Sequence, residues 1–175
     1  MSGPRSSGSS ASRRSSLRRE SALNDDFLDL LIALSDAEAR FLVVGGYAVG
    51  AHGHPRATKD LDIWVEPSIE NAERVIAALE AFVAPLGDLT AEDLATPGVG
   101  FMMGRPPSRI DILTRLVGVE FEAAWTRRVS RRFGNLECPV ISLADLIVNK
   151  RAAGRPQDLA DAAVLEQIRA AETEG

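Results

Sequence analysis

Asp60 and Asp62 lie one residue apart in the segment DLDIWV, whose other residues are all apolar. Alternate side chains of a β-strand share one face, so the two carboxylates would project together, about 6.6 Å apart. Neighbouring carboxylates repel each other and raise each other's pKa, and a divalent cation between them relieves the repulsion. The solvated face of an ordinary strand can carry the same pair, so the pair alone leaves both interpretations open.

A second apolar segment, RIDIL, carries Asp111 at its centre. An acid on the buried face of a sheet is costly unless it is paired or binds a metal. Three strand acids could hold two ions about 3.5–4 Å apart, an arrangement that activates an attacking oxygen and stabilises a leaving one. With Cys138, His52 and His54 as the only cysteine and histidines, zinc is not expected, and carboxylate ligands favour Mg²⁺ or Mn²⁺.

Two adjacent glycines, Gly45 and Gly46, follow the apolar run FLVV and precede the aspartate pair by about fourteen residues. A turn between a strand and a short helix leaves backbone N–H groups free to face an anion. Glycine also lets the backbone approach a phosphate closely. We therefore expect a phosphate subsite beside the carboxylates. Tyr47, His52 and His54 follow the glycines and could contact a base or an acceptor, although packing explains them at least as well.

The composition is that of a globular domain, with 45% hydrophobic and 26% charged residues in 175. The first 19 residues hold five arginines and no acid, so they carry a charge of +5. The net charge of the chain is −5, so the remaining residues carry −10. We expect a disordered Ser/Arg-rich tail over residues 1–22 and one domain over residues 23–175. No apolar run reaches the ~18 residues of a membrane span, and a single cysteine favours a reducing compartment, so we predict a cytoplasmic protein.

Helical and strand periodicities alternate along the chain, which predicts a small α/β domain. We expect a helix capped by Asn24, a second one opened by Ser68, a hairpin turning at Gly134-Asn135, and a helix from Ser142 to Gly154. The expected strands cover 41–44, 58–65, 99–103 and 108–114, and the remaining expected helices cover 47–53, 119–127 and 155–171.

These segments resemble the nucleotidyltransferase superfamily built on the DNA polymerase β-like fold. Its signature is a hydrophobic residue before Gly-Gly or Gly-Ser, an acid-x-acid strand, and an acid on a later strand. This chain supplies Val44-Gly45-Gly46, Asp60-Leu61-Asp62 and Ile110-Asp111-Ile112. The sequence around these motifs is most similar to the small bacterial branch that includes the AbiEii-like toxins of toxin–antitoxin systems. The residues that carry this similarity are Arg56, Thr58, Asp60, Asp62, Lys150, Arg155, Asp158 and Asp161.

The resemblance implies an α/β (α+β) nucleotidyltransferase fold: a small mixed sheet flanked by helices, followed by C-terminal helices. It also implies that Asp60 and Asp62 hold both metal ions, while Asp111 completes the catalytic metal site and helps to deprotonate the acceptor. The implied nucleotide-binding residues are Gly45, Gly46, Arg56, Thr58, Lys59, Lys150 and Asp158. Lys150 is equally well explained as a solvated charge, and Asp158 as an acid favoured by the start of a helix.

The implied reaction moves a nucleoside monophosphate from an NTP to an acceptor hydroxyl with Mg²⁺ or Mn²⁺ as cofactor. The acceptor is left open between RNA such as tRNA, a protein and a small molecule. A toxin of this branch would have an antitoxin protein as partner. The alternative hypothesis is a non-catalytic nucleotide-binding or protein-interaction module with the same fold.

Overall fold

The computed structural model describes residues 24–58 and 60–175, which form a mixed sheet with the strand order β3-β4-β2-β1-β6-β5. The mixed α/β architecture expected from the sequence is therefore confirmed. The strands are β1 (Phe41–Val44), β2 (Asp60–Val65), β3 (Gly100–Met103), β4 (Arg109–Leu113), β5 (Val129–Phe133) and β6 (Leu136–Val140). The helices are α2 (Asp25–Asp36), α3 (Gly45–Ala51), α4 (Ile69–Ala81), α5 (Ala91–Ala95), α6 (Phe121–Arg127), α7 (Leu143–Ala153) and α8 (Pro156–Glu174).

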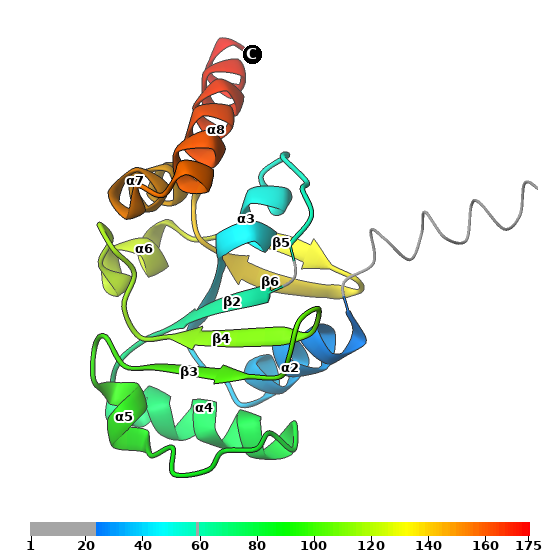
Figure 1. Ribbon diagram of the computed structural model, residues 1–175, viewed down its shortest axis with the longest axis vertical. Coiled ribbons are helices and arrows are strands. Elements are labelled where there is room, and N and C mark those ends of the chain that lie inside the picture. The colour runs from blue at the N-terminus through cyan, green and yellow to red at the C-terminus, as the bar shows by residue number, and fades with distance from the viewer. Residues whose placement is uncertain (1–23, 59) are drawn as a thin grey trace, which may run out of the picture.

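The helices form two groups on either side of the strands that carry the aspartates (Figure 1). In one group α4 packs against α2 and α5, and it reaches the sheet at β2. In the other, α7 packs against α8 and α3, and α8 extends beyond the body of the molecule. None of the described helices is both long and apolar enough to span a lipid bilayer. The expected tail over residues 1–22 and Lys59 lie outside the described residues.

Local sequence signals set the helix ends where they were predicted. Asn24 caps α2 by accepting the Asp26 N–H at 2.9 Å, and Ser142 caps α7 by accepting the Asp145 N–H at 3.1 Å. Gly154 ends α7 with φ of +70°, a left-handed conformation that glycine adopts without strain. These caps fix where α7 begins and ends, and α7 supplies one wall of the cleft described below.

The strand register brings the predicted site residues together. β1 and β2 are antiparallel and place Val44 opposite Asp62, so the glycines that follow β1 lie beside the second aspartate. β2 and β4 are parallel and place Asp62 opposite Asp111. Alternation along β2 puts Leu61 and Ile63, both fully buried, on the core side and leaves the aspartates half-buried on the other face.

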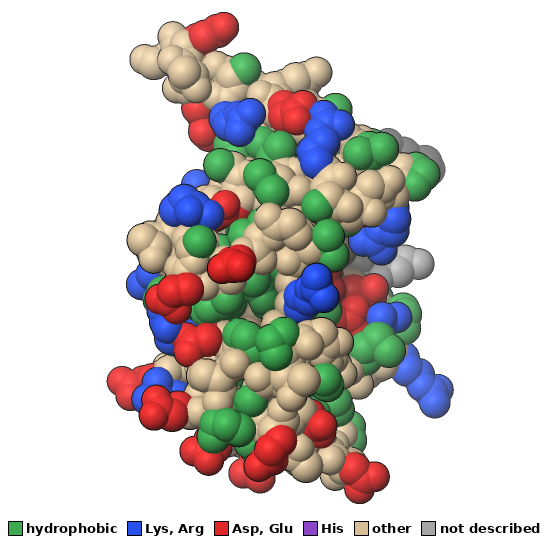
Figure 2. Space-filling view, turned by 90° about the vertical axis from the view of Figure 1, so that its left-hand side faces the viewer, with side chains coloured by type: hydrophobic (Ala, Val, Ile, Leu, Met, Phe, Trp, Pro, Cys, Tyr) green, Lys and Arg blue, Asp and Glu red, His purple; other side chains and the backbone are tan. Residues whose placement is uncertain are grey.

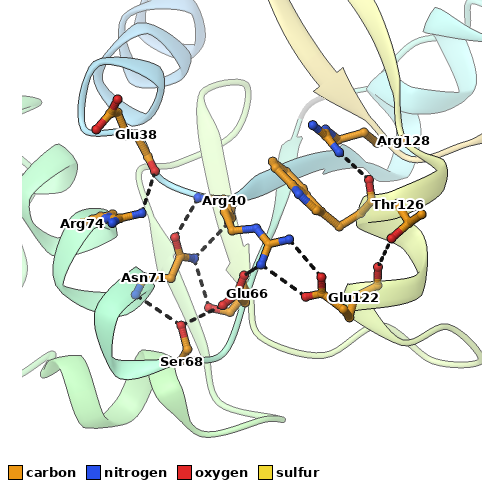
Figure 3. Close-up of polar contacts among 10 residues, drawn as sticks. Glu38, Arg40, Glu66, Ser68, Asn71, Arg74, Glu122, Thr126 and Arg128 are labelled. Carbon is orange, nitrogen blue, oxygen red and sulfur yellow. Dashed lines mark hydrogen bonds and ion pairs between the residues drawn. The ribbon is translucent and has the colours of Figure 1, made fainter.

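A buried amide locks the start of β1 to the end of β2 (Figure 3). The Asn71 Oδ1 accepts the Arg40 N–H at 2.7 Å, and its Nδ2 donates to the Arg40 carbonyl at 2.9 Å and the Glu66 carbonyl at 3.1 Å. Asn71 is 2% exposed, so its amide makes these hydrogen bonds with little competition from water. The contact helps to hold the register that sets Val44 opposite Asp62.

Asn71→Ala should lower the free energy of unfolding by about 2 kcal/mol, because it leaves the Arg40 N–H without a partner and removes one of the two hydrogen bonds that each of the Arg40 and Glu66 carbonyls accepts. Urea denaturation followed by circular dichroism measures this change. Glu73→Ala, an exposed change on the same helix, is the control and should stay within about 0.5 kcal/mol of the parent. Equal losses in the two variants would contradict the proposed lock.

Candidate active site

A cleft of about 700 Å³ lies over the aspartate-bearing face of β2 and β4 and is bounded by α7, α8 and the start of α3. Every described member of the predicted site lines it. The lining residues are Val44, Gly45, Gly46, Arg56, Thr58, Asp60, Asp62, Arg109, Asp111, Leu113, Arg115, Leu116, Val117, Asn149, Lys150, Ala153, Arg155, Gln157 and Asp158. Tyr47, His52 and His54 are not among them.

The cleft mixes strong charges of both signs, with five basic and four acidic side chains in its lining. The α4–α5 end of the molecule differs, because acidic side chains gather there on the surface (Figure 2). The exposed acids of that end are Glu70, Glu73, Glu80, Asp88 and Glu92. The cleft is therefore less negative than the surface at the α4–α5 end, and it is better suited to an anionic ligand.

The environment of Asp62 disfavours its charged form. Burial, together with the neighbouring charges of Asp111 and Asp60, raises the pKa of Asp62 to about 6, while Lys150 acts in the opposite direction. A carboxylate with such neighbours is stabilised by any added positive charge. This position is therefore prepared for a cation.

Asp60 supplies a second indication that the site fits a metal ion. Its Oδ1 is buried and has no hydrogen-bond partner among the described residues. An unpartnered buried carboxylate oxygen is costly unless a ligand completes it. Together with the carboxylates of Asp62 and Asp111, this oxygen makes an all-oxygen donor set of the kind that Mg²⁺ and Mn²⁺ prefer.

Asp111 lies beside Asp62, but its carboxylate is already engaged. Arg109 donates from Nε to Asp111 Oδ1 at 2.9 Å and from Nη2 to Asp111 Oδ2 at 3.1 Å. Within residues 24–58 and 60–175, no three His, Cys, Asp or Glu side chains converge closely enough to hold an ion. The three acids are thus neighbours in the sheet, and they do not form a closed cage in this conformation.

The glycine pair makes room for the acids. Gly45 has φ of +64°, and a Cβ there would lie 2.1 Å from Asp62 Oδ2. A Cβ on Gly46 would lie 2.7 Å from Thr58 Oγ1, whose hydroxyl donates to the Asp60 carbonyl at 3.3 Å. The glycines were expected to face a phosphate. The structure adds that no side chain fits between β1 and the aspartate strand.

A buried ion network forms the wall opposite the acids. Lys150 Nζ lies 3.2 Å from Asp158 Oδ1 and 3.2 Å from Asp161 Oδ2. Arg56 binds Asp161 through Nε and Nη2, both at 2.9 Å. Burial alone would raise the pKa of Asp158, but hydrogen bonds from Arg155 and Lys150 hold it below its usual value. Lys150 is 6% exposed, so the solvated-charge alternative for this residue is wrong.

The resemblance implied Arg56 and Lys150 as nucleotide-binding residues, and in the structure each is bound to buried aspartates. Asp158 also accepts the Arg155 backbone N–H at 3.3 Å, so it caps α8 in addition to binding Lys150. Packing accounts for His52, whose Nε2 lies 2.7 Å from the Ile141 carbonyl oxygen in the core.

Arg109 and Arg115 both line the cleft, and neither was predicted as a site residue. Arg109 precedes Asp111 by two residues on β4, so strand alternation alone would have placed the two on one face. Arg115 is exposed, and no ion pair joins it to another of the described residues. It lies just beyond β4, where no local pattern indicated a role.

Comparison with known proteins identifies the fold. No protein-family model and no curated protein sequence matches this chain. Among solved structures, the lincosamide antibiotic adenylyltransferase LnuA in its lincomycin-bound form matches with a TM-score of 0.52 at 12% identity, over 84% of this chain and 98% of that one. The antibiotic-resistance factor ANT(2'')-Ia matches with a TM-score of 0.54 at 15% identity, over 86% of this chain and 90% of that one. The chain therefore has the nucleotidyltransferase fold that the sequence resemblance implied. Its likeness to the AbiEii-like branch stays a prediction.

Gly45→Ala should destabilise the protein by about 2 kcal/mol and weaken Mn²⁺ binding, because the new methyl group meets Asp62 and φ is positive. Urea denaturation and calorimetry measure the two effects. Gly50→Ala is the matched control in the same helix, since its Cβ would meet only Pro55 Cα at 3.8 Å. That control should be neutral or stabilising by up to about 1 kcal/mol. Parent-like behaviour of Gly45→Ala would refute the steric argument.

The raised pKa of Asp62 predicts a pH dependence of stability in metal-free protein. The folded state keeps this proton up to about pH 6, whereas the unfolded chain releases it near pH 3.8. The parent should therefore lose up to about 3 kcal/mol relative to Asp62→Asn as the pH rises from about 4 to 6. Urea denaturation of both proteins in chelator across this range tests the prediction, and parallel stability curves would contradict it.

Proposed function

We propose that this protein is a divalent-cation-dependent nucleotidyltransferase that moves a nucleoside monophosphate from an NTP to an acceptor hydroxyl. The observation that carries the proposal is the pairing of Asp62 on β2 with Asp111 on β4, beside the unpartnered Asp60 oxygen, on the wall of a large cleft. The fold shared with LnuA, a lincosamide antibiotic adenylyltransferase, supports the same class of reaction.

Asp60 and Asp62 would hold Mg²⁺ or Mn²⁺, with Asp111 as the third carboxylate. When bound, these ions supply the positive charge that polarises the phosphate and lowers the pKa of the attacking hydroxyl. The bond that forms joins the acceptor oxygen to the α-phosphorus, and the bond that breaks releases pyrophosphate. Asp111 would accept the acceptor's proton, and its position beside Asp62 supports this role.

The remaining residues position the nucleotide. The backbone of Gly45 and Gly46 would approach the triphosphate where no Cβ is in the way. Arg115, exposed on the cleft, is the basic side chain most available to the phosphates. Lys150 and Asp158 would act by fixing the wall formed by α7 and α8, since they are bound to each other.

Thr58 would orient the Asp60 backbone, and Arg56 would fix the segment before β2 through its ion pair with Asp161. Lys59 keeps its predicted role in nucleotide binding.

A small molecule is our favoured acceptor. LnuA is a lincosamide antibiotic adenylyltransferase and was solved with lincomycin bound. A cleft of about 700 Å³ lies within the usual range of small-molecule sites. RNA and protein acceptors are the alternatives, and either would be compatible with a toxin that has an antitoxin partner. If the protein is a toxin, its expression in the cytoplasm of a bacterial host would arrest growth, and expression of the Asp62→Asn variant would not.

The proposal is tested with α-labelled NTPs and Mg²⁺, offered to tRNA, to cell protein and to a panel of hydroxylated antibiotics. Label should move to one acceptor class, and Asp60→Asn, Asp62→Asn and Asp111→Asn should each lower the rate at least about 100-fold. Glu73→Gln, on the surface of α4, should retain the parent rate. Transfer that survives Asp62→Asn would refute the assignment.

One observation favours the non-catalytic alternative, namely the engagement of both Asp111 oxygens by Arg109. A nucleotide sensor of this fold would bind an NTP, as calorimetry would show, and would transfer no label to any acceptor.

A further inference from the structure

Arg109 lies among the acids in a way that the transfer reaction does not require. The β2–β4 register places Arg109 directly opposite Asp60, and Asp111 directly opposite Asp62. One face of the two strands therefore presents three carboxylates and a single guanidinium. The hydrogen bond and charge of Asp111 raise the pKa of Arg109, with smaller contributions from Asp60 and Asp62. The guanidinium thus supplies part of the positive charge that this cluster needs.

The geometry of the pair is specific as well as electrostatic. Two parallel N–H donors of Arg109 bind the two oxygens of Asp111 at 2.9 and 3.1 Å, the bidentate arrangement that only arginine can make. Both oxygens that would ligate a metal ion therefore already accept a hydrogen bond from Arg109. The Asp60 Oδ1 has no hydrogen-bond partner among the described residues, so Arg109 compensates Asp111 and leaves this oxygen uncompensated.

The guanidinium also has a route away from the cluster. The Arg109 side chain is 36% exposed, and its Nη2 lies 2.8 Å from the sulfur of Met102, itself 64% exposed on the neighbouring strand β3. The guanidinium therefore lies at the open rim of the cleft, where water can solvate it if it leaves Asp111. Its release would leave no cation buried.

We propose that Arg109 is an internal counter-cation, which holds Asp111 until a divalent cation replaces it and so makes completion of the cation site depend on its release. The inference rests on the proposed function for the identity of the site. Arg109 is in this sense a positioning residue, acting through Asp111. Once released, the guanidinium has a natural new partner in the polyphosphate of the nucleotide, so nucleotide and cation should each strengthen binding of the other.

Arg115 provides the matched control because it lines the same cleft and carries the same charge. Loss of either arginine makes the cleft more negative by one unit, which by itself attracts cations. Only loss of Arg109 also frees the Asp111 carboxylate. Arg109→Lys isolates the effect of freeing Asp111, because it keeps the positive charge and loses the bidentate hydrogen bonds.

The test measures Mn²⁺ affinity of the full chain without nucleotide, from the electron paramagnetic resonance signal of free Mn²⁺. Arg109→Gln should bind Mn²⁺ about tenfold more tightly than the parent, and Arg115→Gln less than about threefold more tightly. Arg109→Lys should also bind more tightly than the parent. In thermal unfolding, metal-free Arg109→Gln should melt below the parent and gain more from added Mn²⁺.

The outcomes separate this inference from the proposed function. Equal affinities of the parent, Arg109→Gln and Arg109→Lys would overturn the counter-cation role and leave the metal site intact. Weaker binding by Arg109→Gln would also overturn it, since Arg109 would then organise Asp111 for the metal. Binding by Arg109→Gln and none by the parent would support the role and count against catalysis. No binding by any variant would overturn both.

Discussion

Repulsion among three carboxylates on one face of a sheet is the constraint around which this molecule is built. The parallel pairing of β2 with β4 sets Asp62 beside Asp111, and Asp60 lies two residues before Asp62 on the same face. Side chains of this kind do not stabilise a fold, as the raised pKa of Asp62 indicates. The opposite face of β2 is apolar, with Leu61 and Ile63 fully buried. Carboxylates that cost stability on an otherwise apolar strand are typical of a functional site.

Much of the surrounding structure compensates for this cluster. Gly45 leaves the space that Asp62 occupies, and Arg109 and Lys150 bring positive charge to it. Lys150 in turn is fixed by Asp158 and Asp161, so the last two helices are tied to the site by buried ion pairs. A buried pair of this type contributes mainly to placement, because desolvation offsets most of its attraction. The C-terminal helices are thereby held as a wall of the cleft.

Local patterns in the sequence predicted what depends on neighbouring residues. The caps at Asn24 and Ser142, the hairpin at Gly134-Asn135 and the shared face of Asp60 and Asp62 all follow from short-range rules, and the structure agrees with each. The apolar residues around Asp111 indicated a strand acid, and the family resemblance assigned it to the same site as Asp60 and Asp62 before the place of its strand in the sheet was known. The parallel pairing of β2 and β4 was not predicted, because periodicity says nothing about which strands become neighbours.

Side-chain partners that are distant in sequence were not predicted. Arg56 was expected to bind nucleotide, and no local pattern indicates its ion pair with Asp161, 105 residues away. Strand alternation places Arg109 on the face of Asp111, but alternation does not say that the guanidinium binds that carboxylate.

The central claim is that the carboxylates of β2 and β4 share a divalent cation. Anomalous diffraction from crystals grown with Mn²⁺ and a non-hydrolysable NTP analogue tests it most directly. The account predicts a manganese peak bridging Asp60 and Asp62, with Asp111 turned towards it and Arg109 withdrawn. Manganese elsewhere, or none while Arg109 still holds Asp111, would contradict it.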